Sequence, residues 1–445
     1  MSGFEIGLIS IIAMLLLIYV GMHVSVVLAL ISFVGVWIIK GNVKIAISLL
    51  WISSAKTVAD FLFGVIPLFV LMGLLVSSAG MGRDTYDIAN SMLRKVRGGL
   101  GMATVIANMI FAAITGVSIA SATVFTRISV PEMLRFGYKG RFAVGTVAGS
   151  SVLGMLIPPS ILLIVFALIA EESVGDLFIA GIGPGVLLTA SFCGLIAIMA
   201  YGFPHLVAEP GALDRQVEQD AMPKGDLIKK IIPISVLIFV VLGGIYMGLY
   251  TPTEAGAAGA LVAFLFALMR KKLTFRKMWN ILVETGHITA TLLFLIISAS
   301  MYSRMLGISG LPTELGQVIG DMNASLWQLL LLYVVILIIL GTIIDSVSIM
   351  LIAVPLFLVI LAPFDVNLVW FGIVTVIAVE IGLLTPPLGL AVYVIKSTLV
   401  QKDISLADIF IGAAPFALTM LVVLILVMFF PGIALYLVEI KDLWN

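Results

Sequence analysis

The chain has 445 residues, of which 62% are hydrophobic and 11% are charged. Soluble domains are about half apolar and about a quarter charged, so this composition excludes an ordinary soluble protein and indicates an all-α polytopic membrane protein in a lipid bilayer. The formal net charge is zero, which gives no electrostatic reason to expect nucleic acid as a partner. The single cysteine, Cys193, excludes an intramolecular disulfide and a cysteine-ligated metal cluster.

Apolar runs in the first half predict a series of membrane helices. The predicted segments, in chain order, are helices at 4–20 and 24–39, a surface segment at 46–58, a helix at 60–80, a basic loop at 81–99, a hairpin at 100–134, and helices at 142–170 and 177–201. The longest polar segment follows, and it is expected to form a cytoplasmic linker at 206–230.

The second half predicts a similar order. Its segments are helices at 231–250, 254–269 and 281–303, a hairpin at 326–363, and helices at 368–400 and 406–430. Trp279 is expected on an interfacial helix before the third of these. Glu254 follows Thr253 at a helix start, where a carboxylate caps the helix, so we interpret it as structural.

The hairpins are predicted from limb length and charge. Each limb of the segment 100–134 has about 14 residues, fewer than the roughly 20 that span a bilayer. Basic residues flank both of its ends, which places both ends on the cytoplasmic side. A re-entrant hairpin with its tip at 115–121 fits best, and two full crossings with a tight outer turn remain the alternative. The second hairpin is expected to have its tip at 341–348.

One short motif occurs twice, 228 positions apart, as Gly154-Met-Leu-Ile-Pro158-Pro159 and Gly382-Leu-Leu-Thr-Pro386-Pro387. Two prolines within an apolar run must interrupt a helix, because they remove backbone donors and clash with the preceding turn. Irregular backbone at membrane depth is stable only where protein buries it or where it lines a watery cavity. The two breaks therefore predict a midplane binding site in a transporter made of two repeats.

The repeats are expected to have inverted topology. Residues 1–205 and 231–445 would each hold about five crossings, one re-entrant hairpin and one Pro-Pro broken helix, and an odd number of crossings inverts the second copy. With both termini outside the cytoplasm, 18 of the 24 Lys and Arg residues lie in cytoplasmic segments and five lie outside. The one that remains, Arg127, lies within the first hairpin.

Two sets of candidate site residues follow from the tips and the breaks. Hydroxyl, carboxylate and unwound backbone oxygens suit Na⁺, with two or more sites. The candidate Na⁺ ligands are Ser118, Ser150, Ser151, Gly154, Asp345, Ser346, Ser348, Gly382 and Thr385. Small residues that only allow close helix packing are the alternative.

An organic anion is the expected substrate, because exposed half-helix N-termini favour negative charge. The planar guanidinium of Arg127 is suited to binding a carboxylate. The alternative is that Arg127 lies near the cytoplasmic end of the limb and extends its guanidinium to the lipid headgroups. The candidate substrate contacts are Arg127, Thr123, Ser121, Pro159 and Ser160. Glu380 lies deep in a crossing, where it would neutralise a cation, pair with a base, carry a proton or make a structural hydrogen bond. Asp345 and Glu380 occur in the second copy only.

In these features the chain resembles the large membrane subunit, DctM-like, of the tripartite ATP-independent periplasmic (TRAP) transporters. The resemblance rests on the 115–121 tip followed by Arg127, on Gly149-Ser-Ser-x-x-Gly-x-Leu-Ile-Pro-Pro-Ser160, and on Gly382-Leu-Leu-Thr-Pro-Pro-Leu-Gly389. It implies a Na⁺-driven elevator transporter with a fold like that of the ion transporter superfamily. The moving transport part would comprise about 100–201 and 326–430, and the scaffold about 1–80 and 231–303.

The resemblance also implies partners and a location. A soluble periplasmic binding protein would deliver a carboxylate such as a C4-dicarboxylate or sialic acid, and a separate small four-helix membrane subunit would complete the complex in a bacterial or archaeal inner membrane. The sequence contains no nucleotide-binding or catalytic motif, so we expect a secondary transporter and not an enzyme. The alternative is a stand-alone Na⁺/dicarboxylate symporter with a related inverted-repeat fold.

Overall fold

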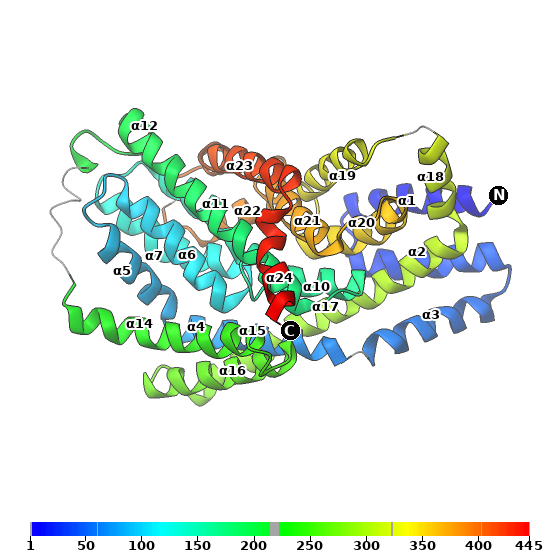
Figure 1. The fold of residues 1–445 in the computed structure, drawn as a ribbon, viewed down its shortest axis with the longest axis horizontal. Helices are drawn as coiled ribbons and strands as arrows, with labels where there is room; N and C mark the ends of the chain where they lie inside the picture. Colours follow the sequence, from blue (N-terminus) through cyan, green and yellow to red (C-terminus); the bar gives the residue numbers. More distant parts are fainter. Residues whose placement is uncertain (1, 60, 214–221, 322–323, 402, 445) are drawn as a thin grey trace.

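The computed structural model describes residues 2–59, 61–213, 222–321, 324–401 and 403–444, and these ranges fold almost entirely into helices (Figure 1). Their only extended pairing is an isolated antiparallel bridge between Tyr138 and Ala208. Six of the described helices are long and apolar enough to span a membrane, or up to eight if each of two bent helix pairs forms one span. The prediction of an all-α polytopic membrane protein is confirmed.

The helices of the first half follow the predicted order, with one difference. They are α1 (Gly3–Tyr19), α2 (Val24–Lys40), α3 (Val43–Val58), η1 (Phe61–Gly64), α4 (Val65–Ser78), α5 (Met81–Leu93), α6 (Gly99–Thr115), α7 (Ser118–Arg135), α8 (Gly140–Ser151), α9 (Leu153–Leu156), α10 (Ile161–Ala170), α11 (Val174–Gly202) and α12 (Pro204–Val207). The prediction of a loop at 81–99 is wrong, because this segment contains α5. Buried Met81, Thr85, Ile88 and Ala89 recur at helical spacing, and the basic residues near the end of the segment concealed that pattern.

The second half also follows the predicted order. Its elements are α14 (Lys224–Ile238), the π-helical η2 (Phe239–Gly243), α15 (Gly244–Tyr246), α16 (Pro252–Met269), α17 (Phe275–Ser309), α18 (Leu311–Asp321), α19 (Leu326–Gly341), α20 (Ser346–Leu361), η3 (Ala362–Phe364), α21 (Leu368–Leu383), α22 (Leu390–Thr398), α23 (Leu406–Phe429) and α24 (Gly432–Trp444). The linker predicted at 206–230 ends earlier, since α14 begins at Lys224, and its residues 214–221 lie outside the described ranges. Trp279 lies within the 35-residue helix α17 and not on a separate interfacial helix, and α24 follows the last predicted crossing.

Helix starts in the second half carry polar caps. The Thr251 side chain accepts a hydrogen bond from the Glu254 backbone N–H at 3.3 Å, and the Glu254 carboxylate accepts one from the Thr251 N–H at 2.8 Å. This reciprocal capping box satisfies two donors that the first turn of a helix leaves free. The structural interpretation of Glu254 therefore agrees with the structure.

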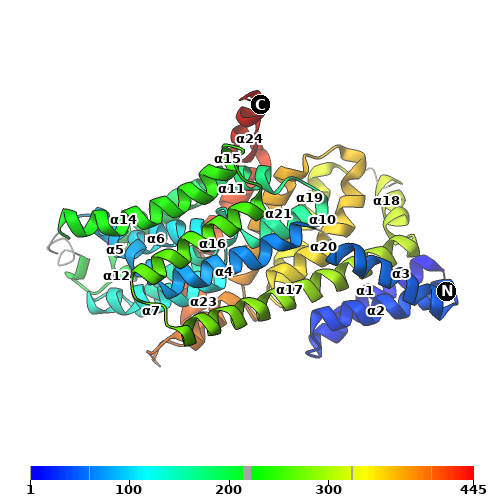
Figure 2. The ribbon, with the colours of Figure 1, turned by 90° about the horizontal axis from the view of Figure 1, so that it is seen from below.

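Two helix groups lie side by side along the long axis of the molecule. In one group α4 packs against α16 and α17, while α17 continues along α2 and α3 (Figure 2). The other group contains α6 to α11 and α19 to α24. Its centre is an aromatic core in which Phe371 of α21 contacts Phe166 of α10 and Tyr333 of α19, with ring centroids 6.0 and 4.9 Å apart. The second group is thus built from both halves of the chain.

Helices α8 and α23, which come from different halves of the chain, approach each other backbone to backbone. A Cβ atom built on Gly145 would lie 2.1 Å from the carbonyl oxygen of Gly412, and one built on Gly412 would lie 2.1 Å from the carbonyl oxygen of Arg141. No larger residue fits at either position without moving a helix backbone. The Arg141 guanidinium also donates a 2.7 Å hydrogen bond to the Asp408 carboxylate at the start of α23.

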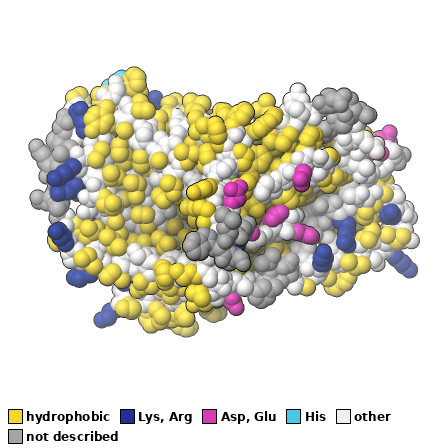
Figure 3. All heavy atoms as spheres, viewed as in Figure 1, with side chains coloured by type: hydrophobic (Ala, Val, Ile, Leu, Met, Phe, Trp, Pro, Cys, Tyr) yellow, Lys and Arg dark blue, Asp and Glu magenta, His cyan; other side chains and the backbone are white. Residues whose placement is uncertain are grey.

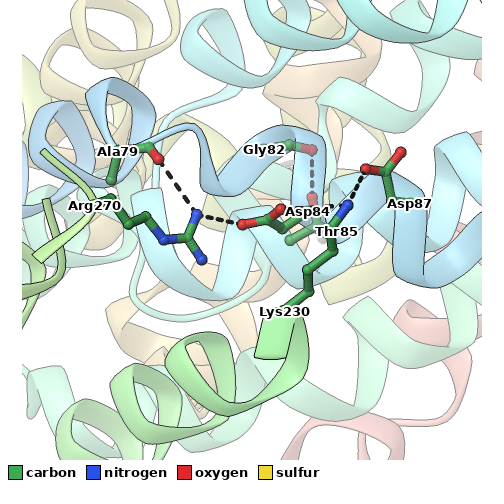
Figure 4. Close-up of polar contacts among 7 residues, drawn as sticks. All are labelled: Ala79, Gly82, Asp84, Thr85, Asp87, Lys230 and Arg270. Carbon is green, nitrogen blue, oxygen red and sulfur yellow. Dashed lines mark hydrogen bonds and ion pairs between the residues drawn. The ribbon is translucent and has the colours of Figure 1, made fainter. Parts of the chain in front are cut away.

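An ion-pair cluster lies where α4 meets α5 at an angle of 66° (Figure 4). Arg270, at the end of α16, donates to the carbonyl oxygen of Ala79 at 3.4 Å and pairs with Asp84. Lys230 of α14 pairs with Asp87 at 2.5 Å and with Asp84 at 3.7 Å. The cluster therefore connects both sides of the bend to the α14 and α16 helices.

The surface fits a lipid environment. Hydrophobic side chains cover most of the middle of the face shown in Figure 3, and Lys and Arg side chains lie toward the two ends of the long axis. Large hydrophobic residues such as Leu16, Leu261 and Leu331 are 59–61% exposed within the described chain. In a membrane protein such side chains face acyl chains instead of water.

Candidate functional site

The first hairpin contacts the first helix break directly. Gly116 lies between α6 and α7 with a φ of 67°, and its carbonyl oxygen accepts a 3.3 Å hydrogen bond from the N–H of Ile161, the first residue of α10. A Cβ atom at this position would lie 2.2 Å from the carbonyl oxygen of Pro159. Both the positive φ and the close approach require glycine at the tip. The peptide bond between Pro158 and Pro159 is cis.

The second hairpin contacts the second break in a similar way. The carbonyl oxygen of Thr342, between α19 and α20, accepts hydrogen bonds from the N–H groups of Leu388 and Gly389 at 3.1 and 3.4 Å. Beside this contact, a Cβ built on Gly341 would lie 2.7 Å from the Cα of Gly382. The Pro386-Pro387 peptide bond is also cis. Each predicted hairpin segment thus forms a helix pair whose tip satisfies backbone donors of its own interrupted helix.

In the first half the candidate Na⁺ ligands form one buried group. Gly154 lies against the backbone of Ser118, since a Cβ built on Gly154 would be 2.9 Å from the Ser118 nitrogen. Ser150 donates to the carbonyl oxygen of Thr146 at 2.6 Å and accepts a 2.7 Å hydrogen bond from the Asn108 side-chain amide. The Ser151 hydroxyl donates to the carbonyl oxygen of Ala148 at 2.8 Å. These serines are at most 2% exposed.

Sequence reasoning missed Asn108. It lies in the apolar limb α6, is fully buried, and its amide oxygen has no hydrogen-bond partner among the described residues. The hydroxyl of buried Ser121 also lacks a partner there. The sequence does carry a signal for Asn108: a single amide side chain in an apolar membrane helix requires a polar partner on another helix.

In the second half Ser346 and Glu380 are brought together. The Ser346 hydroxyl donates a 3.0 Å hydrogen bond to one carboxylate oxygen of Glu380, which is 2% exposed. The other carboxylate oxygen of Glu380 has no hydrogen-bond partner in the described chain. No Lys, Arg or His within those ranges forms an ion pair with it, so the carboxylate is buried without a basic partner among the described residues.

The remaining candidates of the second half have local partners. Asp345 caps α20 by accepting hydrogen bonds from the Ser348 N–H at 3.0 Å and from the Ser348 hydroxyl. The Thr385 hydroxyl donates to the carbonyl oxygen of Ile381 at 2.8 Å. The Asp345 carboxylate and the Thr385 hydroxyl still have lone pairs available for a ligand, since each oxygen can accept more than one hydrogen bond.

The candidate substrate contacts occupy two different environments. Arg127 projects from the exposed side of α7, which also carries half-buried Thr123 one turn earlier, and it forms no hydrogen bond or ion pair with any residue that the structure describes. Ser160 is fully buried, accepts a 3.3 Å hydrogen bond from the Leu163 N–H and donates to the carbonyl oxygen of Met155. Ser160 therefore caps α10 beside buried Pro159, while Arg127 lies free on the hairpin limb.

The polar groups at the two tips are mainly oxygen donors, which is the donor type that small hard cations take. In the ranges that the structure describes, no group of three or more His, Cys, Asp or Glu residues has metal-binding geometry. Serine hydroxyls, backbone carbonyls and one buried carboxylate are the groups that face the hairpin tips. Helix breaks buried against hairpin tips in an all-helical membrane protein are typical of one class of protein: helical membrane transporters.

Comparison with known proteins identifies the family. A family model described as "Tripartite ATP-independent periplasmic transporter, DctM component" matches residues 11–433, and the chain belongs to this family. The resemblance seen in the sequence is thereby confirmed, and the chain is a secondary-transporter permease subunit and not an enzyme.

Two relatives and one solved structure illustrate the similarity. The chain is 34% identical over 379 residues to the C4-dicarboxylate TRAP transporter large permease protein DctM of Pseudomonas aeruginosa, covering 84% of this chain and 85% of that protein. It is 30% identical to the sialic acid TRAP transporter large permease protein SiaM of Vibrio cholerae, covering 86% and 87%. The crystal structure of the YdaH transporter of Alcanivorax borkumensis matches with a TM-score of 0.58 at 15% identity, over 87% of this chain and 89% of that one, which shows a shared fold.

Proposed function

We propose that this chain is the membrane permease subunit of a Na⁺-coupled, binding-protein-dependent importer of organic acids. The observation that carries the Na⁺ coupling is the buried carboxylate of Glu380, which lacks a basic partner within the described chain and has one oxygen without a hydrogen bond. An uncompensated carboxylate in a low-dielectric interior is strongly destabilising. A bound cation would supply the missing charge.

The residues present fit Na⁺ better than a divalent metal. The second tip would offer the Glu380 carboxylate, the Ser346 hydroxyl and backbone carbonyls. These groups carry one negative charge, and the neighbouring Asp345 carboxylate accepts hydrogen bonds from the Ser348 N–H and hydroxyl. The first tip would offer Ser118, Ser150, Asn108 and backbone oxygens, and Val152 stands where the second half has Glu380. The two ion sites are therefore proposed to differ: one neutral and one with a charged ligand.

The proposed substrate is a small organic acid. The names of the relatives, C4-dicarboxylate and sialic acid permeases, support a carboxylate. Arg127 is the proposed contact for that carboxylate, because its guanidinium is exposed on the hairpin limb without an ion-pair partner in the described ranges. Thr123 and the tip hydroxyl of Ser121 would add hydrogen bonds on the same limb.

The remaining parts of the proposal concern mechanism and assembly. Residues 1–205 and 231–445 are proposed to be inverted repeats, with the transport part at about 100–201 and 326–430 moving as an elevator against the scaffold at about 1–80 and 231–303. A periplasmic binding protein and a separate small membrane subunit are the proposed partners in an inner membrane. Both termini would face the periplasm.

Reconstitution tests this proposal. The chain, its small subunit and the binding protein are placed in proteoliposomes, and uptake of radiolabelled organic acid is measured with an inward Na⁺ gradient, with an equal K⁺ gradient, and without the binding protein. Uptake should require Na⁺ and the binding protein together. Uptake that is independent of the Na⁺ gradient would refute the coupling, and uptake by the chain alone would favour the alternative of a stand-alone Na⁺/dicarboxylate symporter.

Na⁺ sites at the tips can be tested with single substitutions. Ser118→Ala and Ser346→Ala should each raise the Na⁺ concentration for half-maximal uptake several-fold. Ser54→Ala is a matched control, because among the described residues the Ser54 hydroxyl bonds only to the Leu50 carbonyl oxygen of its own helix. An unchanged Na⁺ dependence in both tip variants would contradict ion sites at the hairpin tips.

A further inference from the structure

A cavity of about 590 Å³ lies between the two helix groups, away from the hairpin limb that carries Arg127. Its walls come from α3 and α17 on one side and from α10 and α20 on the other. Its polar lining residues are Ser53, Lys56, Thr57, Glu171, Glu172, Ser300, Ser303 and Arg304. A volume of this size is within the usual range for a small-molecule site.

One wall of the cavity carries positive charge. Lys56 of α3 and Arg304 of α17 line it, and neither forms a hydrogen bond or an ion pair with any residue in the described ranges. Hydroxyls lie beside them: Ser53 and Ser300 are hydrogen-bonded at 3.0 Å, and Thr57 donates to Ser300 at 3.2 Å. Two cationic donors next to fixed hydroxyls are a suitable recognition surface for a carboxylate.

The opposite wall carries negative charge. Glu171 and Glu172 follow the last turn of α10, and they too have no ion-pair partner among the residues described. The C-terminus of α10 adds a negative partial charge at the same place. The two walls of the cavity thus carry charges of opposite sign that do not form salt bridges with each other.

We propose that this cavity binds a small organic acid whose carboxylate contacts Lys56 and Arg304 and whose other end carries hydroxyl or ammonium donors toward Glu171 and Glu172. The proposal rests on the proposed function and narrows its substrate class. A linear dicarboxylate would place its second carboxylate against two glutamates, which like-charge repulsion disfavours. A hydroxylated or amino-bearing monocarboxylate satisfies both walls.

The position of the cavity connects it to both hairpin–break contacts. α10 begins just after the Pro158-Pro159 break, and its last turns form the cavity wall. α20 begins at the second tip, and Leu351 and Pro355 line the cavity about 8 and about 14 Å along the helix from Ser346. A ligand bound in the cavity therefore contacts the two helices that lead to the tips, and we assign the cavity as the site that receives the acid before it reaches Arg127.

Ligand-dependent thermal stability tests the site without requiring transport. The full chain is purified in detergent with its small subunit, and its unfolding midpoint is measured with gluconate, with succinate and with chloride at equal ionic strength. All measurements are repeated in an Arg127→Gln background, which removes the proposed transport-site contact. Gluconate should raise the midpoint in both backgrounds, and succinate should raise it less.

Substitutions of the cavity residues test whether a change in the unfolding midpoint arises from binding at this site. Lys56→Gln and Arg304→Gln should each abolish the rise in midpoint with gluconate. The double substitution Glu171→Gln with Glu172→Gln should make succinate as effective as gluconate. Lys44→Gln is the control, because Lys44 lies on the same helix as Lys56, and it should leave the midpoint shifts unchanged. Three outcomes would overturn the proposal. Gluconate could fail to raise the unfolding midpoint, its effect could persist in both Lys56→Gln and Arg304→Gln, or its effect could disappear in the Arg127→Gln background alone.

Transport kinetics separate this inference from the proposed function. In proteoliposomes with the binding protein, Lys56→Gln should raise the substrate concentration for half-maximal uptake several-fold and leave the Na⁺ dependence unchanged. An unchanged half-maximal concentration would count against the cavity as a receiving site. Absence of Na⁺-driven uptake by the unmodified complex would instead refute the proposed function, while the stability measurements would still decide ligand binding in the cavity.

Discussion

Ser346 donates a 3.0 Å hydrogen bond to the carboxylate of Glu380, 34 residues further along the chain, and both side chains are at most 6% exposed. This contact joins the tip of the second hairpin to α21, the helix that the Pro386-Pro387 break ends.

Glu380→Gln removes the negative charge while it keeps the shape of a carboxylic acid and its ability to accept from Ser346. We expect the Na⁺ concentration that half-saturates a Na⁺-dependent rise in thermal stability to increase by about tenfold or more, equivalent to about 1.4 kcal/mol of lost binding. Glu380→Asp should recover part of the affinity. Thr375→Val on the same helix is the control, since Thr375 bonds to Tyr333 and Phe371 and not to the tip. Equal Na⁺ affinity in Glu380→Gln would show that its carboxylate does not hold the ion.

Arg127→Ala should reduce uptake by about 30-fold or more, because truncation of a charge that pairs with a bound carboxylate typically costs at least 2 kcal/mol. Expression and assembly with the small subunit should be unaffected, since Arg127 makes no hydrogen bond or ion pair in the described ranges. Arg135→Ala is the matched control on the same helix, where the side chain is 75% exposed. Normal uptake by Arg127→Ala would exclude Arg127 as the substrate contact.

Gly341→Ala should separate the second tip from α21. The added Cβ would lie 2.7 Å from the Cα of Gly382, a backbone atom that no side-chain rotation can move away. Overpacking of this kind costs about 1–3 kcal/mol, so we expect a lower unfolding midpoint together with weaker Na⁺ binding. Gly307→Ala in α17 is the control, because among the described residues no heavy atom outside the adjacent backbone of its own helix lies within 4 Å of the added Cβ. A Gly341→Ala protein with unchanged midpoint and Na⁺ affinity would contradict the close contact.

Lys230→Gln should destabilise the bend between α4 and α5. The Lys230 side chain is 26% exposed and pairs with two aspartates, so its loss leaves partly buried negative charge on α5, at a cost of roughly 2 kcal/mol. Lys229→Gln is a close control, since the neighbouring Lys229 side chain is 81% exposed and its single pair with Asp226 should contribute less than about 1 kcal/mol. Comparable midpoints for the two variants would show that the cluster does not stabilise the bend.

The sequence predicts the tips and breaks well because their geometry depends on local chemistry. Single prolines such as Pro184 and Pro355 lie within continuous helices, whereas the consecutive pairs Pro158-Pro159 and Pro386-Pro387 lie at the two breaks. Two adjacent residues without a backbone N–H are a local signal, so they mark the breaks without knowledge of the fold. Gly116 permits the positive φ at the first tip for the same local reason. The order of the helices follows from apolar runs in the same way.

The contacts between segments are harder to predict, because they depend on which helix faces which. The Asn108–Ser150 hydrogen bond joins residues 42 positions apart, and the Arg270–Asp84 pair joins residues 186 positions apart. The charged cavity requires α3, α10, α17 and α20 together, so no local pattern marks it. Helix α5 is not predicted either, because three of its seven buried residues are glycine, aspartate and threonine, which are not apolar.

The contact between Gly145 and Gly412 has a consequence for the energy conversion of the proposed transporter. Helix α8 carries Ser150 and Ser151, and α23 packs against α21, which carries Glu380. With backbone against backbone at the α8–α23 crossing, neither helix can slide past the other without separation of the pair. In the proposed transporter, the helices that carry the two ion sites would therefore move together, and ions bound at both sites would cross the membrane in the same step.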